Sequence, residues 1–175
     1  MSFMNTPFRS ILASMLVLSA PLASASVISY SSSLSGAAES PANASPGTGT
    51  ATLVIDTVAN TMTLDVIFSG LIGTTTAAHI HCCTALPASG TAGVATQTPS
   101  FVGFPLGVTS GTYKHVFDLT DPASWNAAFI NNNGGTAASA EAVLLSGLDA
   151  SRAYLNIHTS TFGSGEIRGF LVRSV

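Results

Sequence analysis

The sequence predicts an all-β protein, folded as an antiparallel β-sandwich or Greek-key barrel with two short helices. Short stretches alternate apolar and polar side chains, which is the period of a strand with one buried face. Clusters of Gly, Pro, Ser and Asn separate these stretches, and the regular strand–helix alternation of a parallel α/β fold is missing. The pattern indicates about six or seven short strands.

Residues 1–25 have the features of a secretory signal peptide. Arg9 precedes an apolar run at 11–18, and Ala23-Ser24-Ala25 supplies the small residues that cleavage needs. We expect cleavage after Ala25, which leaves residues 26–175 as a single domain. The apolar run is too short to span a bilayer comfortably, and no later segment could cross one.

Composition limits the partners of the mature chain. After residue 25 it has four basic and eight acidic residues, so a basic surface for nucleic acid is not expected. Only 7% of the whole chain is charged and 46% is hydrophobic, which excludes a disordered tail. With the signal peptide, this favours a secreted or periplasmic β-protein, whose partners the sequence does not identify.

The first half of the chain contains the clearest hairpin. A first strand is expected at 27–36, and a loop rich in Pro, Gly and Ser follows it at 42–49. Strands at 50–56 and 62–69 are then joined by a turn at 58–60. Ile67 is the one apolar residue out of phase with the buried set of the second strand, which is Met62, Leu64, Val66 and Phe68.

A long connection follows at 84–111, with three prolines and five glycines. Connections of this length are often functional loops, and this one could fold over a site beside it. The next strand, at 111–119, places His115 on the same face as Tyr113 and Phe117. We therefore interpret His115 as a packed histidine at the core or at the edge of aromatic rings, rather than as a ligand.

Two short helices are expected after this strand. Asp121 is a good N-cap, and Trp125 and Phe129 at i and i+4 give the first helix one apolar face. The second helix is alanine-rich, covers 137–146, and is expected to end at Gly147.

The sequence around residue 80 points to a metal site. His79 and His81 lie two residues apart in a predicted strand and share one face. His158 has a similar setting in a strand predicted at 153–159. Three imidazoles from two strands can bind one ion, and imidazole ligands favour copper or zinc over calcium. We hypothesise that copper binds here and consider zinc the weaker candidate; the alternative is ordinary polar residues on half-exposed strands.

The last strand, at 166–172, adds polar groups that could support such a site. Glu166 and Arg168 share its polar face, opposite Ile167. Glu166 and Asn156 are candidates for orienting the histidines through hydrogen bonds. The alternative for Glu166 and Arg168 is a surface ion pair, which typically contributes about 0–1 kcal/mol.

Cys82 and Cys83 follow His81 directly. In an oxidising compartment two thiols usually pair, but adjacent residues of a regular strand point apart. Three states stay open: a vicinal disulfide, a link between two chains, or free thiols. A vicinal disulfide would force a turn directly after His81.

Five blocks of the sequence, in this order, resemble the CHRD domain, a module repeated in chordin and found singly in exported bacterial proteins: residues 34–41, 68–71, 78–81, 153–159 and 165–169. The resemblance covers 27–172. Ser40 departs from it, since a hydrophobic residue more often precedes that proline. The resemblance implies an extracellular binding or scaffold role.

A second likeness is to copper-zinc superoxide dismutases, which also combine a His-x-His strand with a distant copper-binding histidine. It implies that His79, His81 and His158 hold copper and that Arg168 guides superoxide. The zinc-site pattern of that family is not evident, and no serine-hydrolase elbow, zinc-protease helix or phosphate loop occurs. Whether the protein is an enzyme therefore stays open between a copper protein and a non-catalytic interaction module.

Overall fold

The computed structural model describes Met1 and residues 26–174, so the predicted signal peptide and most of its cleavage site lie outside the described part. Within residues 26–174 the elements are β1 (Val27–Ser35), η1 (Gly36–Ala38), β2 (Thr48–Asp56), β3 (Thr61–Ser69), β4 (Thr75–His81), β5 (Gly111–Asp118), η2 (Pro122–Ser124), α1 (Ala127–Asn132), α2 (Ala137–Asp149), β6 (Tyr154–Thr159), β7 (Ile167–Phe170) and β8 (Val172–Arg173). None of the helices there is long and apolar enough to cross a bilayer.

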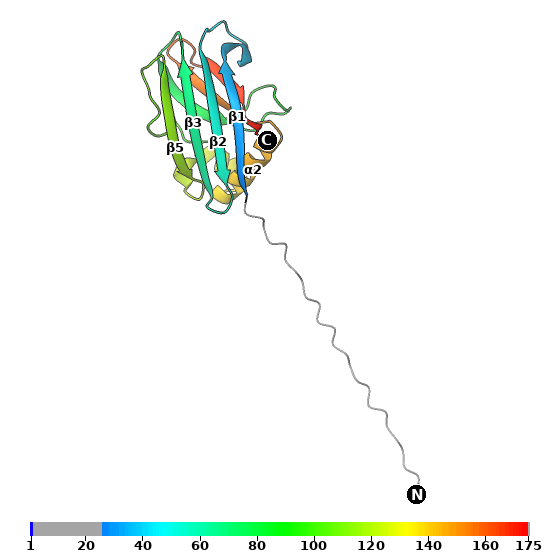
Figure 1. Ribbon diagram of the computed structural model, residues 1–175. Coiled ribbons are helices and arrows are strands. Elements are labelled where there is room, and N and C mark those ends of the chain that lie inside the picture. Colours follow the sequence, from blue (N-terminus) through cyan, green and yellow to red (C-terminus); the bar gives the residue numbers. More distant parts are fainter. Residues whose placement is uncertain (2–25, 175) are drawn as a thin grey trace.

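All the strands join one antiparallel sheet in the order β4-β6-β7-β1-β2-β3-β5, with β8 paired to β1. The sheet curls into a half-barrel, and α1 and α2 lie at one of its ends (Figure 1). The prediction of an antiparallel all-β fold with two short helices is confirmed. The architecture is a single curled sheet, and its core is built from apolar residues of nearly every strand and of α2: Tyr30, Leu53, Leu64, Ile80, Phe117, Leu144, Leu148 and Ile157.

The predicted hairpin is confirmed as β2 and β3. Leu53 lies opposite Leu64 and Ile55 opposite Met62, and all four side chains are completely buried. Ile67, the apolar residue out of phase, is 55% exposed. Strict alternation therefore identified the buried face of this hairpin, because a side chain one residue out of phase points to the opposite face.

The first predicted helix is divided in two. The Asp121 carboxylate accepts a hydrogen bond from the Ala123 N–H, so Asp121 does cap a helix, but that helix is the single turn η2. Trp125 then has extended backbone, and Asn126 caps the separate helix α1. The Trp125 indole N–H donates to the Leu119 carbonyl at 3.0 Å, a bond that turns the chain back toward the end of β5 and that helix periodicity does not indicate.

The second predicted helix is longer than expected, because α2 continues through Gly147 to Asp149. Gly147 is buried inside the helix and does not end it. A Cβ atom at this position would collide with the Sγ atoms of both Cys82 and Cys83. The glycine is thus explained by close packing of the helix against the cysteine pair rather than by a C-cap.

The long connection after β4 covers the free edge of that strand. Its backbone N–H groups at Ala95 and Phe101 donate to the carbonyls of Ile80 and Ala78, at 2.9 and 3.1 Å. A sheet edge exposes unpaired polar groups, and these bonds satisfy those of β4. They also hold the connection beside the histidines of β4.

Candidate metal centre

The pairing of β4 with β6 places three histidines on one face of the sheet. His79 lies opposite Asn156, His81 opposite Tyr154, and His158 opposite Ala77. Directly paired residues share a face, and so do residues two apart, so the three imidazoles project from the same side. The central expectation from the sequence, that strands distant in the chain bring these rings together, is confirmed.

Each imidazole is held by one backbone carbonyl. His79 uses Nε2 to bond the Pro99 oxygen at 2.7 Å, and His81 uses Nδ1 to bond the Ala92 oxygen at 2.9 Å. His158 uses Nδ1 to bond the carbonyl of Gly163 at 3.0 Å. A carbonyl can only accept, so each of these nitrogens carries the ring proton.

The other nitrogen of each ring therefore presents a lone pair. These atoms are Nδ1 of His79, Nε2 of His81 and Nε2 of His158, and all three are buried without a hydrogen-bond partner. Buried polar atoms are nearly always paired, so three unpaired acceptors at one place require an explanation. A cation bound here would account for all three.

The candidate ligand atoms all lie within 4.8 Å of one another. Bonds of about 2.0–2.1 Å to a single ion would bring tetrahedral ligands to roughly 3.4 Å apart. The cluster is therefore somewhat wider than the spacing of about 4 Å or less that shared ligation requires. Ligation of one ion would require the ring nitrogens to move closer together.

Burial lowers the pKa of all three histidines, most clearly that of His81, to about 4. The charged form loses its hydration when the ring is enclosed, so the neutral imidazole is favoured. For His81, the neighbouring histidines and Arg168 lower the pKa further. At neutral pH the rings are thus uncharged, which is the form that binds metals.

Glu166 does not contact these histidines through a hydrogen bond. Its carboxylate accepts bonds from the Ser45 and Thr159 hydroxyls and from the N–H groups of Ile72 and Gly73. Burial raises the pKa of Glu166, but these four donors together lower it below its ordinary value. Glu166 instead ties two loops to the end of β6, and backbone carbonyls take the orienting role that the sequence had suggested for it.

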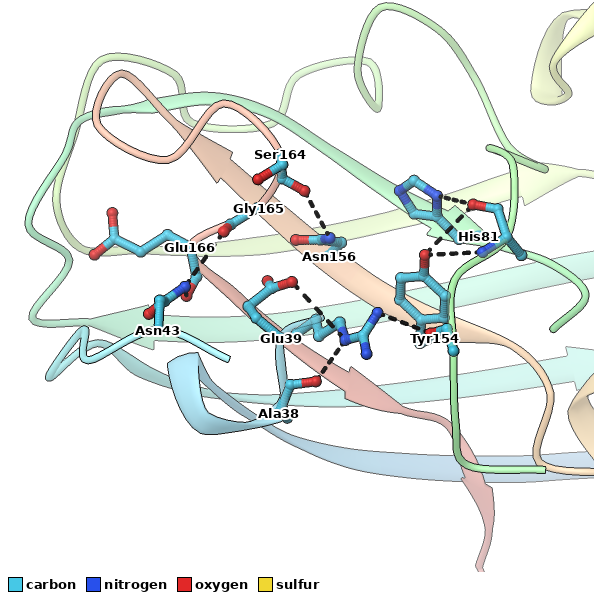
Figure 2. Close-up of polar contacts among 12 residues, drawn as sticks. Ala38, Glu39, Asn43, His81, Tyr154, Asn156, Ser164, Gly165 and Glu166 are labelled. Carbon is cyan, nitrogen blue, oxygen red and sulfur yellow. Dashed lines mark hydrogen bonds and ion pairs between the residues drawn. The ribbon is translucent and has the colours of Figure 1, made fainter. Parts of the chain in front are cut away.

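Asn156 is closer to the predicted role. It lies on β6, opposite His79 of β4 on one side and Arg168 of β7 on the other. Its Nδ2 donates to the Ser164 carbonyl at 3.4 Å (Figure 2), next to the Gly163 carbonyl that holds His158. Asn156 thus supports the loop that orients a histidine and makes no hydrogen bond to the histidine itself.

Arg168 is buried and is held by protein groups. Its guanidinium donates to the carbonyls of Ala38 and Gly90 and lies 3.8 Å from the Glu39 carboxylate. It also lies over one face of the Tyr154 ring, 4.7 Å from the centroid. With a residue exposure of 4%, Arg168 offers no cationic surface to an incoming anion.

Tyr154 is the residue near the site that sequence reasoning missed. Its ring stacks on the His81 imidazole at a centroid distance of 4.9 Å and an interplanar angle of 3°. The Ala92 N–H donates to the Tyr154 hydroxyl at 3.2 Å, and the Ala92 carbonyl accepts the hydrogen bond from His81 (Figure 2). Tyr154 is therefore a positioning residue for His81. Its alternation with His158 along β6 was the available signal.

Residues 30–171 match the family model of the CHRD domain. The chain belongs to the CHRD domain family. No curated protein and no solved structure gives a match. The match includes all three clustered histidines and the buried residues that surround them, so the candidate centre lies inside the CHRD domain.

Cys82 and Cys83 of this CHRD domain are joined in a vicinal disulfide, directly after His81. The pair packs between β4 and α2, where the Cys83 sulfur lies 3.7 Å from the carbonyl oxygen of Val143. Alkylation of the unreduced protein should leave its mass unchanged, and alkylation after reduction should add two groups. An unreduced protein that takes up the label would contradict the disulfide.

His115 of the CHRD domain lies at the other edge of the sheet, on β5. Its ring contacts Phe117 edge to face, with 4.5 Å between centroids, and stacks on Tyr113 at 6.1 Å. The prediction of a histidine packed against aromatic rings is confirmed, and His115 serves below as a control position.

Proposed function

We propose that this CHRD-domain chain is an exported copper-binding protein, with His79, His81 and His158 as the ligands. The observation that carries this is the cluster of three histidines, each of which has one buried ring nitrogen without a hydrogen-bond partner. The fixed protonation of the opposite nitrogens supports it, because each ring is already in the tautomer that metal binding needs. Export rests on the signal-peptide features of residues 1–25.

Copper is favoured by the chemistry of the donors. The cluster consists of neutral imidazoles, which suit copper and zinc, whereas calcium and magnesium take oxygen ligands. Between the two remaining metals, a given nitrogen site generally binds Cu²⁺ more tightly than Zn²⁺. Bound copper would supply one-electron chemistry, and superoxide dismutation is the enzymatic form of this proposal. The chain's own part is to hold the rings, since Arg168 is enclosed and cannot guide superoxide.

The spacing of the ring nitrogens favours a second candidate, a non-catalytic extracellular interaction module without metal. At up to 4.8 Å apart, the nitrogens are not drawn together as ligands of one ion would be. In that case the histidines serve only to tie the connection after β4 and the β6–β7 loop to the sheet. Metal binding separates the two candidates.

The test is a competitive titration of the purified mature protein with copper and with zinc. We expect one copper ion per chain, copper binding tighter than zinc, and loss of the site in His79→Ala and in His158→Ala. His115→Ala is the matched control and should keep the full stoichiometry. Equal stoichiometry in all four proteins would leave the interaction module as the better account.

Activity and export have separate measurements. Superoxide loss that depends on added copper and disappears in His81→Ala would assign the enzymatic form, and copper binding without such loss would assign a carrier or storage role. N-terminal analysis of the exported protein should begin at Ser26. A protein that stays in the cytoplasm and still begins at Met1 would contradict export.

A further inference from the structure

A pocket of about 450 Å³ lies at the end of the sheet that carries α1 and α2. Asn60 lines it from the β2–β3 turn, Thr120 and Pro122 line it from the segment after β5, and Ala137 and Ala138 line it from the start of α2. Small-molecule sites typically enclose about 300–1,000 Å³, so this pocket has a suitable size.

The walls of the pocket are fixed by hydrogen bonds. The Leu119 N–H donates to the Asn60 carbonyl at 2.8 Å, which ties the end of β5 to the β2–β3 turn. On the opposite wall, the Thr136 hydroxyl and the Ser139 N–H form a capping box at the start of α2. The β2–β3 turn and the segment after β5 are therefore tethered to each other, and the start of α2 is held by its own cap.

Glu141 supplies the only charged side chain that lines this pocket. The residue is 9% exposed, and within residues 26–174 its carboxylate makes no hydrogen bond or ion pair. The carboxylate oxygens of Glu141 are not fully enclosed, so solvent reaches them, and the residue lines the pocket. Burial raises the pKa of Glu141, as expected for a carboxylate without a counter-charge.

We propose that this pocket binds a small organic monoamine, with its ammonium group on the Glu141 carboxylate and its apolar body against Ala137, Ala138 and Pro122. A buried carboxylate is stabilised by a cation that brings its own hydrogen-bond donors. A divalent metal ion does not fit, because it needs several oxygen ligands and this pocket offers one carboxylate. None of these residues belongs to the histidine cluster, so binding here does not depend on copper.

The experiment uses hexylammonium as the probe and hexan-1-ol as the neutral probe of the same chain length. Binding to the mature protein is followed by the amide chemical shifts of Asn60, Thr120 and Thr136, with a chelator present. We expect saturable shifts with hexylammonium and binding of hexan-1-ol that is weaker by roughly tenfold or more. Glu141→Gln should remove this difference, and Asp65→Asn, an exposed carboxylate elsewhere, should preserve it.

A second variant tests the pocket without changing its charge. Ala138→Leu adds volume at the lining, and it should weaken hexylammonium binding while Glu141 is kept. If hexan-1-ol binds as tightly as hexylammonium, the pocket is an apolar cavity without a cation site, and the proposal is overturned. Undiminished hexylammonium binding in Glu141→Gln, or shifts confined to residues outside the pocket, would overturn it as well.

Discussion

We expect the metal-free protein to lose stability as the pH falls from 6.5 toward about 4, because His81 is buried in its neutral form. Burial lowers the pKa of His81 from 6.5 to about 4. Between these values the unfolded chain binds a proton that the folded chain does not, so acid favours unfolding. The stabilisation is fully present above pH 6.5 and is lost as the pH falls through this range. At about 1.36 kcal/mol per pKa unit, the loss is about 3 kcal/mol.

The assay is urea unfolding of the wild type and of His81→Gln with a chelator present, at several pH values between 7 and 4. Glutamine does not titrate, so the difference in unfolding free energy between the two proteins isolates His81. The difference also removes the contribution of Glu39, whose pKa burial raises to about 7 and whose effect on stability has the opposite sign. His115→Gln is the control. A difference between wild type and His81→Gln that stays constant within about 1 kcal/mol would refute the reasoning.

Three further predictions follow from the same contacts. Nitrogen NMR of the metal-free protein should show the proton on Nε2 of His79 and on Nδ1 of His81 and His158; a different tautomer at any ring would contradict the carbonyl anchors. Gly147→Ala should lower the unfolding free energy by about 2 kcal/mol or more, since its Cβ would collide with both disulfide sulfurs, and an unchanged melting temperature would disprove that packing. Gly165→Ala should lower the free energy of unfolding by about 1–3 kcal/mol, because the φ of +133° at this position is unfavourable for alanine. Thermal unfolding measures this change. An unchanged stability would show that the loop relaxes.

The fold could be predicted where the pattern is local. Alternation in the β2–β3 hairpin was sufficient to identify its buried face, including the exposure of Ile67. The helices were less predictable, because Trp125 is positioned by a hydrogen bond to the backbone of Leu119 and Gly147 by sulfur atoms distant in the chain. Rules for helix ends that use only neighbouring residues do not predict either contact. The signal peptide in residues 1–25 stays a prediction.

The histidine cluster was predictable for a different reason. The period of a strand places His79 and His81 together, and the chemistry of imidazole suggested His158 as the third member. What the sequence could not indicate is the set of groups that orient them, since two loops provide backbone carbonyls that any residue type could supply. Side chains such as Glu166 attract attention in a sequence, and here that carboxylate serves the loops beside the site.

The most direct test of the copper centre is X-ray absorption spectroscopy of the mature protein loaded with one equivalent of copper. Our account predicts three imidazole nitrogens at about 2.0 Å from the metal in the wild type, and no such shell in His158→Ala, which loses the site. It also predicts an unchanged spectrum in His115→Ala. A coordination shell of sulfur, or of oxygen without imidazole, would contradict the assignment of His79, His81 and His158 as the ligands.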